Sequence, residues 1–569
     1  MVPLESELLL AFFPYAWQRG LVTPERSVEY RERWNIWAVM GTPRRHWRRS
    51  DRESYTPASG DYPETRATHE HRMKHELRAR WQVIAIVVAC IVGIALRVMH
   101  LSRRGNLWLD EAMLAQSIVD RSPRGLLFSP LDFHQVAPPG FLQALKLSTL
   151  LVSPIEIALR LPAMLYSIAG LILFAFIAAR RLPKLEPLVA VVVLAAGPLV
   201  IAYAAEAKQY SSDMFFTLLI SYVALELRDS GYSSRWLRIA AALGLIVVWF
   251  SDTAVITLAG VGIALALTAL FGRDRKAVRP LLILGVVWSA AAIAALIGAE
   301  RRVAGGTASV MRSYWTGRGS FMPIPRSAND ALWLPRTLAD VLINSLGLRI
   351  LFGLTILLAL WGIISLWRRG DRHLLAIFFA PVVLTLIAAL ARLYPFAGRL
   401  TLFLVPAFAI AVAAGIGSIG GLARRWAPVA QIVILLMLLS PQRVLTAAHP
   451  LPWRVQEIDP VLAYIAANRQ PGDKMYAYWG AYPAAMFYGR RYGFNYENVT
   501  AGTVSKEWKV VAEDAAQLRG SSRVWVLFSH DLEPGLRHNV LHHLDSIGSR
   551  YPAVGDSAEG VRAYLYDLR

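Results

Sequence analysis

Cysteine is almost absent from this chain of 569 residues, which has a single thiol at Cys90. A lone cysteine excludes an intrachain disulfide, so any part of the chain outside a membrane must be stable without one. A signal-peptide pattern is also missing, because the first residues do not combine a basic start, an apolar run and a small-residue cleavage site.

Charged residues are scarce inside a series of long apolar blocks, although they make up 18% of the chain and hydrophobic residues make up 55%. A helix needs about 20 apolar residues to cross a bilayer core about 30 Å thick. Blocks of this length exclude a soluble multidomain protein and predict an all-α polytopic membrane bundle. They lie near 82–100, 138–153, 156–178, 185–203, 211–227, 236–251, 253–271, 279–298, 348–367, 374–392, 400–419 and 427–441.

The net charge of +20 comes from 60 Lys and Arg against 40 Asp and Glu. Such an excess can indicate a nucleic-acid partner, but here the arginines stand in short clusters between the apolar blocks. That distribution is typical of cytoplasmic loops of membrane proteins and argues against nucleic acid. The clusters lie at 180–184, 228–238, 273–279, 368–372 and 424–425.

These clusters also limit the number of crossings. Span 82–100 leaves the cytoplasm and the cluster at 180–184 must be back inside, so one crossing fits between them. Block 156–178 is the better candidate, because 138–153 is short, begins with two prolines and contains Lys146. We expect 138–153 to be a juxtamembrane or re-entrant helix on the outer side. The map predicts about 11 crossings, with 12 or 13 left open.

The end of the chain follows a different pattern from the apolar blocks. Asp459-Pro460 resembles a helix start, and the segments 474–479, 523–528 and 562–568 alternate like strands. Helical stretches near 511–518 and 533–545 separate them. We therefore predict a C-terminal extracytoplasmic α/β domain. The expected domains are a cytoplasmic, disordered tail at 1–78, a transmembrane domain at 79–445 whose first outer loop is 101–155, and the α/β domain at 446–569.

Two adjacent carboxylates, Asp110 and Glu111, follow the first span on the predicted outer side. A carboxylate beside low-dielectric walls can have its pKa raised toward neutrality and so take a proton from a hydroxyl nucleophile. The pair is a candidate for a general base and its helper. The alternative is a pair of ordinary loop acids, or the N-cap of a short helix.

Further polar side chains fall on the same predicted side. His134 and Gln135 precede the double proline, and a short turn holds Glu206, Lys208 and Tyr210. A helix start and an interfacial turn with aromatic anchors are the plainer interpretations.

Two arginines at outer span ends, Arg160 and Arg399, have planar forks suited to a phosphate. Their alternative role is to anchor lipid headgroups. Taken together, the outer polar groups predict a site that joins a polar substrate to a lipid phosphate.

At these positions the chain resembles the polytopic, lipid-phosphate-dependent glycosyltransferases of the GT-C type, which include the protein O-mannosyltransferases and the aminoarabinose transferase of lipid A. The resemblance rests on the acidic pair, on His134 with Pro138-Pro139, and on Arg160-Leu-Pro162. The turns at 206–210 and 395–399 and the segment 476–483 are similar to a bacterial branch.

The resemblance implies a bacterial inner-membrane enzyme that transfers a hexosyl or pentosyl group, with inversion, from a polyprenyl phosphate to a glycan, lipid or protein acceptor. Asp110 would be the general base. The leaving phosphate would be held by Arg160, Lys208 and Arg399, and the substrate hydroxyls would be oriented by Glu111, Gln135 and Glu206.

No cofactor is certain. Paired carboxylates can hold a divalent metal, but no His/Cys cluster or acidic triplet at ligand spacing argues for one.

The competing functions are a transporter or lipid flippase and a membrane scaffold. A transporter would need polar groups near mid-membrane, whereas the charges here gather at the outer ends of the spans. A scaffold would leave the acidic pair unexplained.

Overall fold

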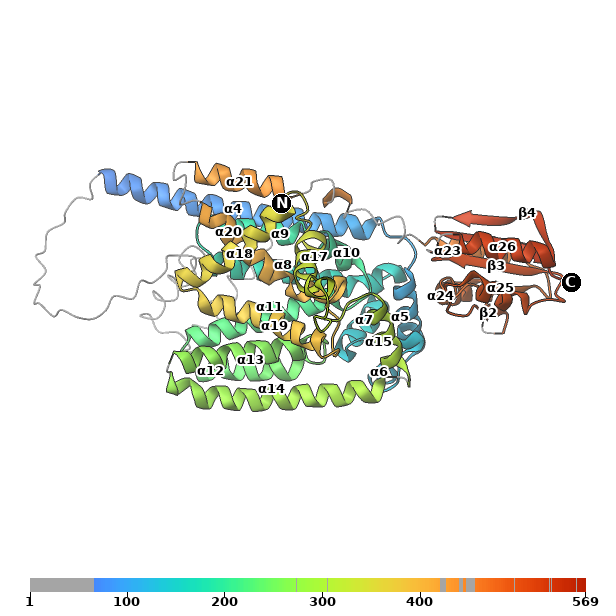
Figure 1. Ribbon diagram of the computed structural model, residues 1–569, viewed down its shortest axis with the longest axis horizontal. Helices are drawn as coiled ribbons and strands as arrows, with labels where there is room; N and C mark the ends of the chain where they lie inside the picture. Colours follow the sequence, from blue (N-terminus) through green and yellow to red (C-terminus); the bar gives the residue numbers. More distant parts are fainter. Residues whose placement is uncertain are drawn as a thin grey trace, which may run out of the picture. The chain divides into compact units, whose positions relative to one another are not determined.

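The computed structural model describes residues 66–569, except 273, 304, 420–425, 440–443, 447–455, 496, 532, 534 and 559. Most of the predicted tail at 1–78 lies outside the described residues. Residues 80–569 form one compact unit. The predicted fold class is confirmed, because a large helical part precedes a small region that contains a sheet (Figure 1).

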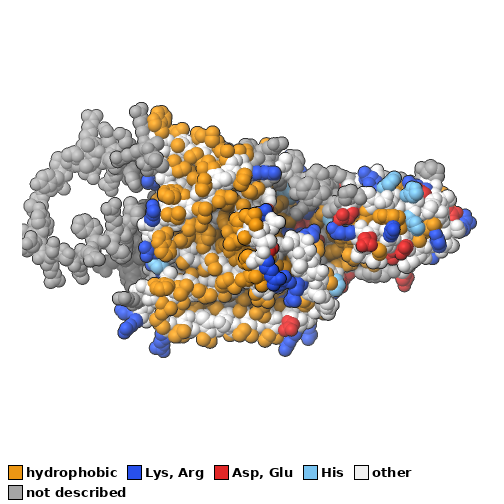
Figure 2. Space-filling model, in the orientation of Figure 1, with side chains coloured by type: hydrophobic (Ala, Val, Ile, Leu, Met, Phe, Trp, Pro, Cys, Tyr) orange, Lys and Arg blue, Asp and Glu red, His pale blue; other side chains and the backbone are white. Residues whose placement is uncertain are grey.

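Seven helical segments of the described chain are long and apolar enough to cross a membrane, or eight if one bent pair counts as a span. The chain is therefore a membrane protein, and the predicted count of about 11 crossings stays a prediction. Large apolar side chains are exposed on these helices, where lipid would cover them (Figure 2). The seven are Arg80–Ser102 of α4 (Arg66–Ser102), α8 (Ile155–Arg181), α13 (Ala254–Phe271), α14 (Arg275–Arg302), α18 (Phe352–Arg369), α19 (Arg372–Leu390), and Gly398–Ser418, which joins η4 (Gly398–Leu404) to α20 (Val405–Ser418).

The bent pair consists of α9 (Glu186–Ala195) and a segment that starts with α10 (Pro198–Ala202), and its two parts meet at 56°. Pro198 causes the break, since proline has no N–H to donate and disfavours helical backbone at the residue before it. Three further helices are too short or too polar to meet the criteria for a span: α11 (Tyr210–Asp229), α12 (Ser234–Val247) and α21 (Ala427–Leu438).

Small residues bring α18 and α20 into close contact. A Cβ added at Gly362 would clash with the backbone of Ala411, and one added at Gly415 would clash with the backbone of Leu358. Glycine at such positions lets helix backbones approach closely in a membrane, where lipid offers little hydrophobic drive for helix association.

The predicted cytoplasmic charges meet at one end of the helices. Arg181, at the end of α8, pairs with Glu226 of α11, and Arg369, at the end of α18, pairs with Glu186 of α9. Arg160 lies near the opposite end of α8. A helix of 27 residues is about 40 Å long at about 1.5 Å per residue, so the two arginines stand far apart along it.

The predicted first outer loop, residues 101–155, is folded into short helices. They are α5 (Leu109–Asp120), α6 (Pro123–Phe128), η1 (Asp132–His134) and α7 (Pro139–Leu151). With 13 residues, α7 is shorter than a span requires. The long connection between α14 and α18 also contains helices, namely α15 (Thr307–Gly317), α16 (Ala328–Ala331), α17 (Trp333–Asp340) and η3 (Val341–Ser345).

The C-terminal region is built on a five-stranded sheet of order β2-β1-β3-β5-β4. The pairs β1–β2 and β1–β3 are parallel, and β3–β5 and β4–β5 are antiparallel. The three predicted strands are present as β1, β3 and β5. The elements are α23 (Ile458–Asn468), β1 (Lys474–Ala477), α24 (Tyr482–Gly489), η7 (Arg490–Tyr492), β2 (Val499–Ala501), α25 (Trp508–Ala516), β3 (Val524–Ser529), α26 (Leu536–Ile547), β4 (Ser549–Ala558) and β5 (Val561–Asp567).

One hydrophobic core joins this sheet to the first outer loop. Leu114 and Ile118 of α5 belong to the same buried cluster as Val461 of α23 and Met486 of α24. A second cluster covers the other face of the sheet with side chains of α25 and α26. The C-terminal region is therefore packed directly onto the segment that carries the acidic pair.

Candidate functional site

The acidic pair lies in the first turn of α5. Carboxylates are favoured there because the first N–H groups of a helix point outward and carry partial positive charge. Consecutive residues of a helix are about 100° apart around its axis, so the two carboxylates face different surroundings. The structure gives Asp110 and Glu111 very different partners.

Glu111 is completely buried and fully bonded. Its carboxylate accepts hydrogen bonds from Arg160 Nε at 2.9 Å and Nη2 at 2.8 Å, and from Arg104 Nη2 at 2.5 Å. The backbone N–H groups of Ala207 and Trp108 donate to it at 2.9 and 3.0 Å. Burial alone would raise the pKa of Glu111, but the two guanidinium groups hold it well below its usual range.

Arg160 is equally buried and offers no N–H to a ligand in this arrangement. The donors that do not reach Glu111 are directed at the backbone carbonyls of Arg104, Gly105 and Asn106. This geometry revises the prediction that the fork of Arg160 holds a phosphate. The fork instead fastens the start of the first outer loop to α8.

Asp110 has a more open environment. Its carboxylate pairs with Arg399 Nη1 at 2.7 Å, and 24% of the Asp110 side chain and 20% of the Arg399 side chain are exposed. Lys208 and His530 also act on it electrostatically. Burial would raise the pKa of Asp110, but Arg399 and Lys208 bring it below its ordinary value. The expected rise of the carboxylate pKa toward neutrality is therefore wrong for both acids, and Asp110 is a carboxylate at neutral pH.

The turn between α10 and α11 supplies the other cation. Lys208 is buried, and its Nζ donates to Gln135 Oε1 at 2.5 Å. Burial lowers the pKa of Lys208, whereas the nearby Asp110 raises it. The guanidinium of Arg399 lies 5.5 Å from the ring centre of Tyr210, within cation–π range. Glu206 is buried in the same turn and acts electrostatically on Lys208.

His134 and its neighbour Gln135 contact different parts of the molecule. Its Nδ1 is 2.8 Å from the hydroxyl of Thr307 in α15, so the histidine ties the first outer loop to the long connection after α14. Gln135 instead joins the group around Asp110. The structure thus brings together Asp110, Gln135, Glu206, Lys208, Tyr210 and Arg399, and it holds Glu111 with Arg160 in a separate buried cluster.

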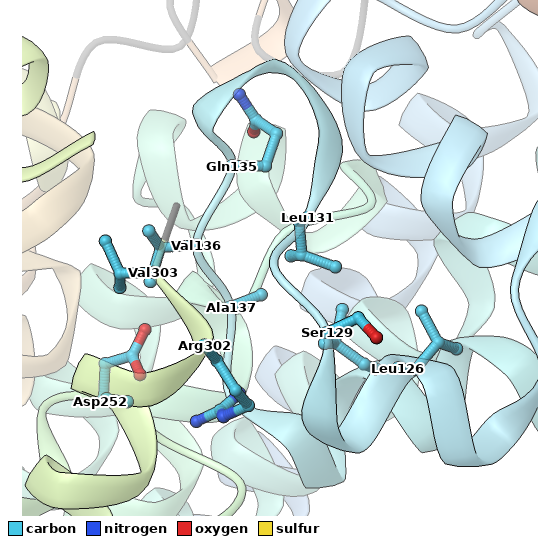
Figure 3. Close-up of a pocket in the computed structure, with 11 residues that line it drawn as sticks. Leu126, Ser129, Leu131, Gln135, Val136, Ala137, Asp252, Arg302 and Val303 are labelled. Carbon is cyan, nitrogen blue, oxygen red and sulfur yellow. The ribbon is translucent and has the colours of Figure 1, made fainter. Parts of the chain in front are cut away.

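A small cavity of about 20 Å³ opens beside Gln135 (Figure 3). Asp252, between α12 and α13, and Arg302, at the end of α14, also line it, together with apolar side chains such as Val303. This volume has room for about one water molecule.

Three residues of the site were not identified from sequence. Arg104 and Trp108 closely precede the acidic pair, so their closeness in the chain was a usable signal. His530 lies in the loop after β3, and its ring centre is 4.4 Å from that of Trp108. No sequence pattern marks this contact, because it depends on how the C-terminal sheet packs.

The residues do not fit a divalent cation. Both oxygens of Glu111 are occupied by arginine and backbone donors, and Asp110 is paired with Arg399. Within the described part of the chain there is no group of three or more His, Cys, Asp or Glu side chains that could hold a metal ion.

No family model and no curated protein sequence matches the chain. Solved structures do resemble it. ArnT from Cupriavidus metallidurans, bound to undecaprenyl phosphate, has a TM-score of 0.51 at 13% identity, over 86% of this chain and 98% of that one.

The oligosaccharyltransferase of Archaeoglobus fulgidus, in complex with zinc and sulfate, has a TM-score of 0.50 at 12% identity, over 84% of this chain and 72% of that one. The same protein tethered to an acceptor peptide with an NVT sequon also scores 0.50, at 12% identity, over 85% of this chain and 74% of that one. The chain therefore has the fold of the polytopic GT-C glycosyltransferases.

Proposed function

We propose that this protein is a glycosyltransferase that moves a sugar from a polyprenyl phosphate to an acceptor hydroxyl, at the outer face of a bacterial inner membrane. The observation that carries the proposal is an ionised, partly exposed Asp110 beside two cations, Arg399 and Lys208. A base and a phosphate-binding pair are the two groups that such a transfer requires. ArnT, which shares the fold, was solved with undecaprenyl phosphate.

The proposed step is an in-line displacement at the anomeric carbon. The acceptor oxygen forms a bond to this carbon while its proton passes to the carboxylate of Asp110. The bond between the anomeric carbon and the phosphate oxygen breaks, and its electron pair stays on that oxygen. The sugar is transferred with inversion, and the lipid phosphate leaves with one more negative charge on its oxygens.

Arg399 and Lys208 are the groups that stabilise this charge. In the structure Arg399 is paired with Asp110, so an incoming phosphate would share the guanidinium with the carboxylate. Gln135 orients Lys208 through its hydrogen bond of 2.5 Å. Glu111 and Arg160 are positioning residues in this scheme, because they fix α5 and the backbone before it. Glu206 acts electrostatically on Lys208, and His134 braces the loop through Thr307.

The test replaces Asp110 with asparagine, which keeps the shape of the side chain and removes the base. Loss of a general base lowers rates by about 100- to 10,000-fold. We expect the sugar that the protein adds to disappear from the envelope of Asp110→Asn cells, as read by mass spectrometry of glycans and lipids from cells with and without the gene.

The matched control is Asp120→Asn, on the same helix, where the carboxylate pairs with Arg490 at the surface. This variant should retain the modification. If Asp110→Asn cells, with normal amounts of protein in the membrane, carry the same envelope sugars as wild-type cells, the proposed function is wrong.

A further inference from the structure

His530 brings the C-terminal sheet to the acidic pair. It directly follows β3, and its ring packs edge-on against Trp108 at 4.4 Å and 72°, two residues before Asp110. A second tryptophan, Trp479, stands 6.0 Å from the same ring. The imidazole is therefore held between the first outer loop and the sheet, within electrostatic range of Asp110.

The backbone at His530 is in the left-handed region, with φ of 59°. Side chains rarely adopt this conformation, and glycine adopts it at no steric cost. The loop is also tightly supported, since a Cβ added at Gly480 would lie 2.6 Å from the carbonyl oxygen of Ser529 and 2.8 Å from Cβ of His530. Strain of this kind, held in place by close packing, is often found at functional sites.

The imidazole also has unused hydrogen-bonding capacity. Its Nδ1 is buried and has no hydrogen-bond partner among the described residues. Burial lowers the pKa of His530 to about 4, against the opposite effect of Asp110, so the ring is neutral at pH 7. A neutral imidazole has one N–H donor and one acceptor nitrogen, and can bind a hydroxyl group in either direction.

We propose that His530 positions the acceptor, by holding its hydroxyl group in a hydrogen bond beside the carboxylate of Asp110. This inference rests on the proposed glycosyl transfer and adds that the C-terminal sheet supplies part of the acceptor site. His530 keeps its own proton throughout, and the proton of the hydroxyl passes to Asp110. The acceptor is thus a molecule with a free hydroxyl that reaches Asp110 from the side of the sheet.

The test uses purified full-length protein, with donor and acceptor fractions taken from membranes of cells that lack the gene. Transfer rates are measured while each fraction is varied in turn. In His530→Gly, we expect the apparent KM for the acceptor fraction to rise about threefold to tenfold. This is the loss of affinity that corresponds to the free energy of one hydrogen bond. The apparent KM for the donor fraction should not change.

Glycine suits the left-handed backbone, and the strain it relieves offsets part of the packing that is lost with the ring. His530→Asn keeps a polar group and tolerates this backbone, and should restore part of the acceptor affinity. The control His542→Ala, at an exposed site on α26, should match the wild type in both KM values.

Two results would overturn the inference. One is that the KM for the acceptor fraction is the same in His530→Gly as in a wild type that transfers sugar. The other is an equal rise in the KM values for donor and acceptor, which would indicate a purely structural role. If the wild type itself transfers no sugar between these fractions, the proposed function fails and this inference fails with it.

Discussion

Asp110 and Glu111 are neighbours in the chain, but they lie in two clusters with opposite properties. Around Glu111, two guanidinium groups and two backbone N–H groups fill the carboxylate, and no part of the side chain is exposed. Around Asp110, one ion pair is partly open and Lys208 stands nearby. A saturated ion pair stabilises the fold, whereas a partly open one can exchange its partner for a substrate.

The largest expected effect concerns the stability of the Glu111 cluster. In Glu111→Gln, Arg104 and Arg160 lose their counter-charge while they stay buried, and breaking a buried pair in this way costs about 3–5 kcal/mol. Thermal unfolding of the purified protein in detergent would measure the loss.

The native pKa of Glu111 is depressed, so its contribution is fully present above the unfolded value of about 4.3 and is lost as pH falls. The stability difference between wild type and Glu111→Gln should accordingly stay constant from about pH 5 to 8 and shrink progressively as the pH falls below about 4. Asp229→Asn, in the more exposed pair with Arg181, should cost at most about 1 kcal/mol. If Glu111→Gln and Asp229→Asn lower the unfolding free energy equally, the buried cluster of Glu111 contributes no more than an exposed ion pair, and the contrast is wrong.

An intermediate effect is expected at Arg399. Removing this cation should weaken the binding of undecaprenyl phosphate to the purified protein about tenfold, the value of one charge-assisted contact. In Arg399→Gln, the pKa of Asp110 should also rise, because burial is then opposed by fewer positive charges. The acidic limb of the rate against pH should therefore move to higher pH.

Binding is measured by titration with undecaprenyl phosphate. The acidic limb of the pH–rate profile is measured from transfer rates between pH 3 and 8. Arg349→Gln, an exposed arginine after η3, serves as the control. An acidic limb that does not move in Arg399→Gln would separate Arg399 from Asp110 and weaken the assignment of Asp110 as the base.

The smallest effect is expected where the C-terminal sheet holds the first outer loop. The hydroxyl of Tyr488 accepts a hydrogen bond of 2.8 Å from the backbone N–H of Leu107. Tyr488→Phe keeps the buried ring and removes this bond, at a cost of about 1 kcal/mol. Hydrogen exchange should then be faster at 107–109 and unchanged in α13. Equal protection in both proteins would mean that the sheet does not steady the acidic pair.

Seven of the predicted spans coincide with helices long and apolar enough to cross a membrane, because apolar length is a local property, and the total of about 11 crossings stays a prediction. It also predicted that Asp110, Lys208 and Arg399 would share one side, since basic clusters mark the opposite side. The break at Pro198 was missed, because block 185–203 was interpreted as one span despite its proline. The strands β2 and β4 were missed as well; β2 has only three residues, and pairing decides strands that are so short.

The separation of Asp110 from Glu111 was beyond prediction for a different reason. It depends on where α5 begins, and a shift of one residue would rotate the helix by about 100°. The same holds for Arg160, whose fork suits a phosphate and a carboxylate equally well. Sequence identifies the chemistry of such a group, and packing decides which partner it meets.

The core shared by the first outer loop and the C-terminal sheet has a consequence for biosynthesis. Leu114 and Ile118 are made early, but the side chains that bury them, such as Val461 and Met486, are translated more than 300 residues later. The growing chain therefore has to keep this loop half-packed until residues 461–486 have been translated. Removal or delayed folding of the segment from α23 to β5 would leave the membrane part inserted while the loop that carries Asp110 stays unassembled.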